Sequence, residues 1–431
     1  MFDIGIIGAG PAGYTAAIRA SQYGLSVVLF EKNFIGGTCL NKGCIPTKTI
    51  LHSCELYSEM KNASKYGVQA ENISFDFAKI QERQKNVSEK IRKSLTALIK
   101  SYGVVIVEEE AKITGENKIN DYDVKNIIIA TGSKPNKIKF NGNYSEDFIL
   151  TSDDILNMTE LPESIVIVGS GAIGIEWARI LSSLGVKVSL VEMMDKLVPT
   201  ADLEVSERIS RIFRRSRIDC YTSTTVEEIN ANTLKLSNGK EIQASCLLLG
   251  AGRQTNTIEV DSNFKTDKEN VFAIGDVNRV SMLAHSAMRQ AEDVVEYIYS
   301  GKKSTFNKEL VPAVIYGSPE IAYIGKTEQQ LQANNIEYKK SLFPISALGK
   351  AYADDKIEGF VKILANDNEI LGCHIVSEEA SAMIQQVAIA MQNKLSPKQL
   401  EEVIFAHPTY SEGMLESLLM LDKKAIHLPK Q

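Results

Sequence analysis

The chain has 431 residues, of which 44% are hydrophobic and 24% charged, and its formal net charge is −6 at pH 7. A chain of this length is too long to fold around one ordinary hydrophobic core, so we predict two or three globular domains. The net negative charge does not indicate a binding surface for nucleic acid or an anionic membrane. No apolar run approaches the ~18 residues needed to span a bilayer. A glycine turn beginning at Gly8 leaves no room for a signal peptide, so we expect a cytoplasmic protein.

The first predicted unit covers residues 6–31. It reads as an apolar strand, a Gly-x-Gly-x-x-Gly turn, a helix whose end is marked by Gly24, and a second apolar strand that ends in Glu31. The glycines of the turn are Gly8, Gly10 and Gly13. Glycine at these places permits a tight turn, the close approach of a pyrophosphate and close packing of helix on strand. The pattern predicts a dinucleotide-binding unit in which Glu31 binds ribose hydroxyl groups.

Two cysteines, Cys39 and Cys44, follow this unit in the stretch GGTCLNKGCIPTK. In a regular helix they would lie roughly 7.5 Å apart along the axis, which is more than a disulfide normally tolerates, so pairing requires a distorted backbone. Gly43 allows that distortion, and Pro46 suits the first turn of a helix beginning near Cys44, where exposed N–H groups favour a thiolate. We interpret the pair as a redox-active disulfide; the alternative is two buried free thiols. The other cysteines, expected to be passive, are Cys54, Cys220, Cys246 and Cys373.

The middle of the chain repeats the first unit. After a predicted helix from Ser74 to Tyr102, residues 167–192 align without a gap on residues 6–31, and 23 residues separate the first glycine from the acid in each copy. The second set of glycines is Gly169, Gly171 and Gly174, with Glu192 as the acid. Glu192 favours NAD over NADP, because its carboxylate repels a 2′-phosphate and the following Met193 and Met194 offer no basic replacement.

The last third of the chain contains a different pattern. After a strand at 271–277 and a helix at 286–301, alternating apolar residues such as those at 359–365 predict an antiparallel sheet packed against helices. In AHPTYSEG, His407 can exchange a proton near neutral pH, and Glu412 is placed on the following helix to orient the imidazole. Taken alone, a histidine before a proline is more often structural.

Several motifs together resemble the flavoprotein disulfide reductases of the dihydrolipoamide dehydrogenase type, a class I pyridine nucleotide-disulfide oxidoreductase family. The resemblance covers essentially the whole chain. The motifs are GGTCLNKGCIPTK at 36–48, IIIATGSKP at 127–135, the glycine turn at 169–174, VFAIGDV at 271–277, YGSPEIAYIG at 316–325, GFVKILA at 359–365 and AHPTYSE at 406–412.

The fold that this resemblance and the strand pattern imply is α/β, with two Rossmann-like dinucleotide-binding domains and a C-terminal α+β dimerisation domain. We expect residues 1–150 and 263–310 to form the FAD-binding domain. Residues 151–262 form the NAD-binding domain, and residues 311–431 form the dimerisation domain.

The resemblance also assigns residues to the two cofactors, and to no metal. The expected FAD group is Gly8, Gly10, Gly13, Glu31, Gly37, Thr38, Lys48, Ala130, Thr131, Gly132, Asp276 and Ala284. The expected NAD group is Gly169, Gly171, Gly174, Glu176, Glu192, Gly252 and Arg253. In such enzymes Lys48 matches a lysine near the flavin N5, and Glu176 matches the acid that pairs with it. Without the resemblance, both read as surface charges on helices.

The catalytic group implied by the resemblance is Cys39, Cys44, His407 and Glu412. Cys39 exchanges with the substrate thiol, Cys44 faces the flavin, and His407 is brought to the disulfide from the neighbouring subunit. His285 also matches a family pattern, but we assign it no chemistry.

The implied activity is the oxidation of protein-bound dihydrolipoamide with NAD by a homodimer, which takes its substrate from the lipoyl domain of a 2-oxo acid dehydrogenase or glycine cleavage complex. One alternative is an NAD(P)H-driven reductase of another small disulfide; the other is a non-catalytic dimeric flavoprotein scaffold. The segments between Glu110 and residue 127 and between Arg253 and residue 271 are shorter than the family normally shows, which predicts trimmed surface loops.

Overall fold

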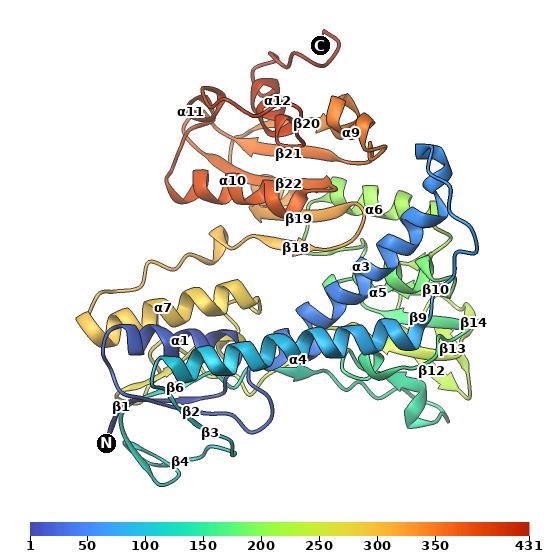
Figure 1. The fold of residues 1–431 in the computed structure, drawn as a ribbon. Coiled ribbons are helices and arrows are strands. Elements are labelled where there is room, and N and C mark those ends of the chain that lie inside the picture. Colours follow the sequence, from blue (N-terminus) through green and yellow to red (C-terminus); the bar gives the residue numbers. More distant parts are fainter. Residues whose placement is uncertain (431) are drawn as a thin grey trace.

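Three larger β-sheets with helices packed on them make up residues 1–430, the part of the chain that the computed structural model describes (Figure 1). The first two sheets lie in the lower half of Figure 1, and the third, from the C-terminal part of the chain, lies above them. The α/β class expected from the sequence is therefore confirmed. Within residues 1–430, no helix combines the length and the apolar character needed to cross a membrane.

The first sheet has seven strands in the order β3-β2-β1-β6-β5-β4, with β17 paired to β6. Its strands are β1 (Phe2–Ile7), β2 (Val27–Phe30), β3 (Val105–Val107), β4 (Ile113–Gly115), β5 (Lys118–Ile119), β6 (Tyr122–Ile129) and β17 (Val271–Ala273). Its helices are α1 (Pro11–Gln22), α2 (Gly37–Lys42), α3 (Cys44–Lys61), α4 (Phe77–Ser101) and α7 (Ala284–Ser300). β1, β2, β3, β6 and β17 pair in parallel, so the turns that follow β1 and β6 meet at the same edge of the sheet.

The second sheet repeats this plan with five parallel strands in the order β11-β10-β9-β15-β8. Its elements are β8 (Ile149–Leu150), β9 (Ser164–Val168), α5 (Ala172–Ser183), β10 (Lys187–Val191), α6 (Leu203–Arg215), β11 (Asp219–Tyr221) and β15 (Cys246–Leu249). A smaller antiparallel sheet contains β12 (Val226–Asn230), β13 (Thr233–Leu236) and β14 (Glu241–Gln243). A short ribbon of β7 (Lys134–Pro135) and β16 (Arg253–Gln254) links the first two regions.

The third sheet is antiparallel throughout, in the order β18-β19-β22-β21-β20, as the alternating pattern predicted. Its strands are β18 (Ala313–Ile315), β19 (Glu320–Gly325), β20 (Lys339–Pro344), β21 (Phe360–Ala365) and β22 (Ile370–Ser377). Its helices are α8 (Glu328–Ala333), α9 (Gly349–Ala353), α10 (Ala380–Gln392), α11 (Pro397–Glu401) and α12 (Glu412–Met420).

One hydrophobic cluster holds these regions together around Trp177, the only tryptophan of the chain. It contains Ile50 from α3, Trp177 from α5 and Ile321 from β19, all at most 2% exposed. Because apolar contact removes surface from water in all three regions at once, it fixes α3 against α5 and the third sheet. This packing positions the beginning of α3, where the candidate site lies.

Candidate functional site

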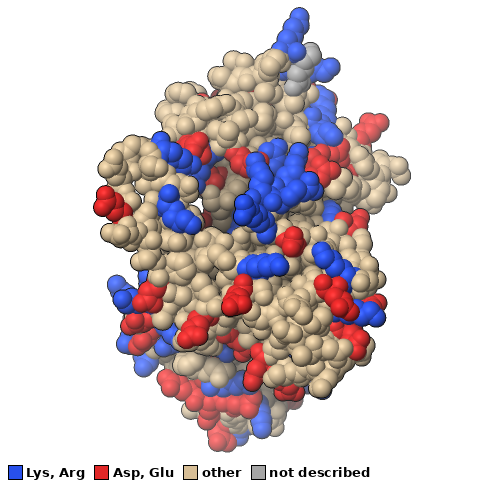
Figure 2. All heavy atoms as spheres, turned by 90° about the vertical axis from the view of Figure 1, so that its right-hand side faces the viewer, with Lys and Arg blue, Asp and Glu red and all other residues tan. Residues whose placement is uncertain are grey.

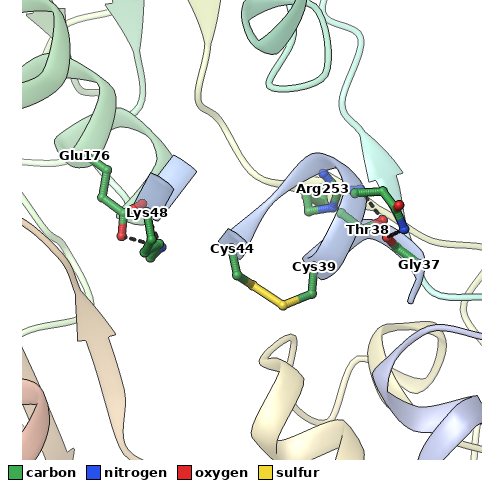
Figure 3. Close-up of a disulfide and its surroundings, with 8 residues drawn as sticks. Gly37, Thr38, Cys39, Cys44, Lys48, Glu176 and Arg253 are labelled. Atoms are coloured by element: carbon green, nitrogen blue, oxygen red, sulfur yellow. Dashed lines mark hydrogen bonds and ion pairs between the residues drawn. A yellow bond between two sulfur atoms is a disulfide. The ribbon is translucent and has the colours of Figure 1, made fainter. Parts of the chain in front are cut away.

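Cys39 and Cys44 form a disulfide at the junction of α2 and α3, with their Cα atoms 4.7 Å apart (Figure 3). α2 ends at Lys42 and α3 begins at Cys44, so the helix is broken at Gly43, where φ is −148° and ψ is −106°. The backbone distortion expected between the cysteines, and the helix start at Cys44, are confirmed. Both cysteines are partly buried, so burial does not distinguish them. They differ in their place on the helices: Cys44 is in the first turn of the 18-residue helix α3, whose N–H groups stabilise a thiolate.

Close backbone contacts explain the glycines around the disulfide. A Cβ atom at Gly43 would lie 3.2 Å from the carbonyl oxygen of Thr38. Gly37 has φ of +57°, and a Cβ there would lie 2.6 Å from the Cα of Gly10 in the first glycine turn. A larger residue at position 37 would therefore push the disulfide segment away from that turn.

The four remaining cysteines lie outside this site and are free. Burial raises the pKa of Cys54 and Cys220 to about 12 and that of Cys246 to about 11, and it also raises the pKa of Cys373. Because the thiolate is the nucleophilic form, these side chains are poor nucleophiles at neutral pH. This fits the passive role expected for them.

Lys48 lies one turn beyond Cys44 on α3, and its Nζ donates to both carboxylate oxygens of Glu176 on α5, at 2.8 and 2.9 Å (Figure 3). The Glu176 side chain is 4% exposed and also accepts a hydrogen bond from the backbone N–H of Tyr316 at 3.0 Å. The Lys48 Nζ lies 4.6 Å from the centroid of the Tyr316 ring, a cation–π contact. The predicted pair is thus formed, and it places a held positive charge beside the disulfide segment.

The two glycine turns have matching geometry. Gly8 and Gly169 both have φ of +100°, and a Cβ at Gly13 or Gly174 would lie 1.8 Å from the carbonyl oxygen of Gly8 or Gly169, respectively. Only glycine fits these positions without moving the backbone. In contrast, a Cβ at Gly171 would meet nothing within 4 Å, so the backbone at the start of α5 is open to an approaching group.

The two acids at the strand ends are also held in the same way. Glu31 accepts hydrogen bonds from the N–H groups of Ala9 and Asn33, each at 2.8 Å. Glu192, 5% exposed, accepts from the N–H groups of Ser170 at 2.8 Å and of Met194 at 2.9 Å. Each carboxylate is therefore fixed beside its glycine turn, where a ribose would lie.

Arg253 lies where the two regions meet. Its Nε donates to Ser133 Oγ at 2.8 Å, and its Nη2 donates to the Ser133 carbonyl at 2.9 Å. The Nη2 also donates, more weakly, to Thr38 Oγ1 at 3.4 Å (Figure 3). Ser133 Oγ in turn donates to Asp276. The structure therefore brings Arg253, which we assigned to the NAD group, against residues of the FAD group.

The remaining predicted residues flank these contacts. Ala130, Thr131 and Gly132 follow β6, and a Cβ at Gly8 would lie 2.4 Å from the Ala130 carbonyl. Ala284 is the first residue of α7, and Gly252, with φ of +71°, precedes Arg253.

The acid–base pair lies in the C-terminal region. His407 Nδ1 lies 2.8 Å from Glu412 Oε1 at the start of α12, and the Thr409 N–H donates to Glu412 Oε2 at 2.8 Å. Burial raises the pKa of Glu412, but the hydrogen bonds from His407 and Thr409 outweigh it and lower the pKa below its usual value. The His407 side chain is 76% exposed. The pair is thus preformed, with the imidazole open to a partner.

His407 and the disulfide lie in different parts of the subunit. Figure 1 places α12 near the top, in the third region, and the beginning of α3 far below it, where α3 packs against α4. His285, to which we assigned no chemistry, contacts the Pro312 carbonyl through Nε2 at 2.8 Å. This contact joins α7 to the strand that leads into the third region.

Sequence reasoning missed residues that support the Lys48–Glu176 pair. Arg179, one turn after Glu176 in α5, donates to the Pro319 carbonyl at 2.6 Å and holds the turn after Tyr316. Burial lowers the pKa of Arg179 to about 10. The i, i+3 spacing from Glu176 to Arg179 was the available signal, but it does not indicate the distant turn that Arg179 reaches.

Residues 2–291 match the family model described as pyridine nucleotide-disulphide oxidoreductase, and residues 311–418 match its dimerisation domain. The chain belongs to the pyridine nucleotide-disulphide oxidoreductase family. Members of this family use FAD and NAD(H).

Characterised family members resemble the chain over its whole length. It is 34% identical to a dihydrolipoyl dehydrogenase from Bacillus subtilis over 99% of both chains, and 35% identical to a mitochondrial dihydrolipoyl dehydrogenase from Pisum sativum over 99% of this chain and 92% of that one. The alignment with the Bacillus subtilis protein spans 470 positions, whereas the present chain has 431 residues, so this chain is shorter than that relative. Among solved structures, LpdA from Mycobacterium tuberculosis matches with a TM-score of 0.90 at 22% identity over 98% of this chain and all of that chain, which supports the fold.

The residues fit the cofactors of this family. Gly10 and Gly171 are the N-caps of α1 and α5, and neither helix start has a side-chain cap, so its N–H groups are free to bind a pyrophosphate. Glu31 and Glu192 lie beside these helix starts as ribose acceptors. The assignment of individual residues to FAD and NAD stays a prediction.

Proposed function

We propose that this chain is a dihydrolipoyl dehydrogenase, which oxidises a protein-bound dihydrolipoyl group and passes the electrons to NAD⁺. The observation that carries the proposal is the Cys39–Cys44 disulfide at the start of α3, in a chain that matches dihydrolipoyl dehydrogenases from end to end. The other class, a non-catalytic scaffold, is disfavoured because nothing in the packing requires both this disulfide and an exposed His407–Glu412 pair.

The cysteines perform two successive thiol–disulfide exchanges. One substrate thiolate attacks Cys39 Sγ, which breaks the Cys39–Cys44 bond and releases Cys44 as a thiolate. The second substrate thiolate attacks the substrate sulfur of this mixed disulfide, which closes the lipoyl disulfide and releases Cys39. The position of Cys44 at the helix start supports its role as the leaving thiolate, because the helix N–H groups stabilise negative charge.

His407 supplies the acid–base step. Its Nε2 accepts the proton of the substrate thiol, while Nδ1 stays bonded to Glu412, which fixes the ring and stabilises the imidazolium. Glu412 acts through His407 and is a positioning residue.

The remaining residues hold the two cofactors. The first glycine turn, Glu31 and Asp276 would bind FAD, and the second turn with Glu192 would bind NAD⁺, whose ribose lacks the phosphate that this carboxylate repels. When bound, these cofactors would supply the acceptors for the electron pair of the reduced cysteines. Lys48, fixed by Glu176, would provide a positive charge that stabilises the electron-rich, reduced flavin ring.

A homodimer is the functional unit in this proposal. Residues 311–418 match a dimerisation domain, and the segment just before His407 exposes apolar side chains, Val403 at 49% and Ile404 at 95%. Exposed apolar surface of this kind is typical of an interface, so a second copy would cover it and bring the disulfide of that copy to His407.

The physiological substrate would be the lipoyl domain of a 2-oxo acid dehydrogenase or glycine cleavage complex. We place the protein in the cytoplasm, because four free thiols fit a reducing compartment.

A steady-state substrate panel tests the function. We expect kcat/KM for dihydrolipoamide oxidation with NAD⁺ to be at least about tenfold higher than kcat/KM for the reduction of glutathione disulfide or coenzyme A disulfide with NADH or NADPH. A preference for one of the other disulfides would replace the proposal with the reductase alternative.

A further inference from the structure

Helix α6 carries an unusual concentration of arginine. The chain has twelve arginines, and five of them fall between residues 208 and 217. Arg208, Arg211, Arg214 and Arg215 lie three, three and one residue apart, so their side chains share one face of the helix. Figure 2 views the molecule from the right-hand side of Figure 1, and it shows a patch of basic side chains in the upper half of the molecule, at the level of α6 in Figure 1.

These four arginines, together with Glu358 just before β21, line a hollow of about 460 Å³, which we call the arginine hollow. The volume lies within the range of small-ligand sites. Arg208 Nη1 donates to Glu358 at 2.6 Å, and Arg215 also pairs with Glu358. Within residues 1–430, Arg211 and Arg214 form no ion pair, so the lining keeps a surplus of positive charge.

Two structural explanations account for only part of this arrangement. Basic residues near a helix C-terminus interact favourably with its dipole, but that effect is confined to the last turn, which contains Arg214 and Arg215 and excludes Arg208 and Arg211. Pairing with Glu358 accounts for Arg208 and Arg215. Arg211 is explained by neither. Glu207 lies one turn before Arg211, but within residues 1–430 the two form no ion pair, and the neighbours of Arg211 on its own face have the same charge.

We propose that the arginine hollow binds a small multivalent anion that carries adjacent phosphate groups. The planar guanidinium group donates two parallel hydrogen bonds to phosphate oxygens, and Arg211 and Arg214 have these donors available. From Arg208 to Arg215 the stripe is about 10 Å long, so it matches a linear chain of phosphates better than a single ion. The site is separate from the disulfide and the glycine turns, and it does not depend on the proposed function.

Calorimetric titration of the FAD-loaded dimer tests the proposal, with tripolyphosphate and ATP as probes at low ionic strength. Each titration is run with and without NAD⁺, so that binding at the dinucleotide site is recognised by its competition with NAD⁺. We expect one binding site per subunit for tripolyphosphate, weakened by added salt. The Arg211→Gln, Arg214→Gln double variant should bind at least about tenfold more weakly.

A second hollow on α4 provides the matched control. It has a similar volume of about 440 Å³ but is lined by only three basic residues, Lys79, Arg83 and Lys90. The Lys79→Gln, Lys90→Gln double variant removes the same amount of charge and should leave the affinity unchanged. The unfolding temperature of each variant confirms folding, and each single arginine variant should give part of the loss.

Three results would overturn the proposal: no binding of tripolyphosphate to the unmodified dimer, an unchanged affinity in the α6 variant, or an equal loss in the α4 variant. The comparison of probes identifies the source of the phosphates. If ATP binds at least about tenfold more tightly than tripolyphosphate with the same arginine dependence, the ligand is a nucleotide. Equal affinities assign the site to the phosphate chain alone.

Discussion

Cys39 and Cys44 lie between α2 and α3, which pack against α4 and α5, whereas His407 and Glu412 lie at the exposed end of a helix in the third region. The cysteines are surrounded by their own chain: Gly37 touches the first glycine turn, and the neighbouring Lys48 reaches α5. Among the described residues 1–430, His407 bonds to the side chain of Glu412, and its own side chain is largely exposed.

The difference supports the proposal that the redox half of the site, Cys39 and Cys44, is complete within one subunit, and that the acid–base half, His407 and Glu412, acts on a second subunit. A rigid environment suits a disulfide that must face a cofactor held by the same domains. An open imidazole suits a group that acts on a disulfide in another subunit. The two halves should therefore respond differently to mutation, depending on which half-reaction is measured.

Replacement of the redox half should have the largest effect. Cys44→Ser removes the leaving thiolate, so dihydrolipoamide oxidation should fall by at least about 10³-fold. The long-wavelength thiolate-to-flavin absorption band of the two-electron-reduced enzyme should also disappear. Cys39→Ser is the matched control and should keep the band. The opposite pattern would reverse the roles of the two cysteines.

His407→Gln should slow dihydrolipoamide oxidation by about 10²- to 10⁴-fold, because the proton of the substrate thiol loses its acceptor. Reduction of the enzyme by NADH, which needs only the cofactor sites and the redox pair, should keep its rate. Stopped-flow absorbance separates the two half-reactions. An equal loss in both would place His407 in the redox half.

Glu412→Gln should reduce the same half-reaction by only about tenfold to a hundredfold, because one hydrogen bond to a charged group contributes about 1.5–3 kcal/mol. The variant also has a pH signature. Since the folded pKa of Glu412 is lowered, its carboxylate stabilises the fold above the unfolded pKa, and this contribution is lost as pH falls through the folded pKa.

Unfolding measured from neutral to acidic pH checks this sign. Wild type and Glu412→Gln should differ most at neutral pH and converge as the pH falls. A difference that grows toward acid would contradict the assigned role of the Glu412 carboxylate.

Glu192→Gln should leave the cysteine pair and the His407–Glu412 pair intact, and of these variants it should have the smallest effect on kcat. Removal of the carboxylate lessens the repulsion of a 2′-phosphate, so the ratio of kcat/KM for NAD to that for NADP should decrease, by about tenfold. Steady-state rates with both coenzymes measure the ratio, and Glu31→Gln, at the matching place in the first copy, should leave it unchanged. A strong preference for NADP in the unmodified protein would refute the role of Glu192.

Features with a local steric cause could be predicted from the sequence. The glycine turns, the break at Gly43 and the helix start at Cys44 follow from what a Cβ or a regular helix would forbid within a few residues. The Lys48–Glu176 pair and the His407–Glu412 pair came from the family resemblance, because spacing alone does not distinguish them from surface charges.

Features that depend on contacts between distant segments could not be predicted. The apolar pattern at 359–365 predicts a strand of an antiparallel sheet, but it does not predict that every residue of β21, including Lys362, is buried. Lys362 can be fully buried because three carboxylates contact its Nζ at 2.6–2.8 Å: Asp202 at the N-cap of α6, Glu204 in α6 and Glu328 in α8. The position of Arg253 against Ser133 depends in the same way on the β7–β16 ribbon.

Mixing two inactive variants tests the split site most directly. Heterodimers of a Cys44→Ser subunit with a His407→Gln subunit contain one site with both defects and one with neither, so we predict that they recover about half of the wild-type dihydrolipoamide activity, although each homodimer has almost none. An isolated heterodimer that stays as inactive as the two homodimers would show that His407 serves the disulfide of its own chain.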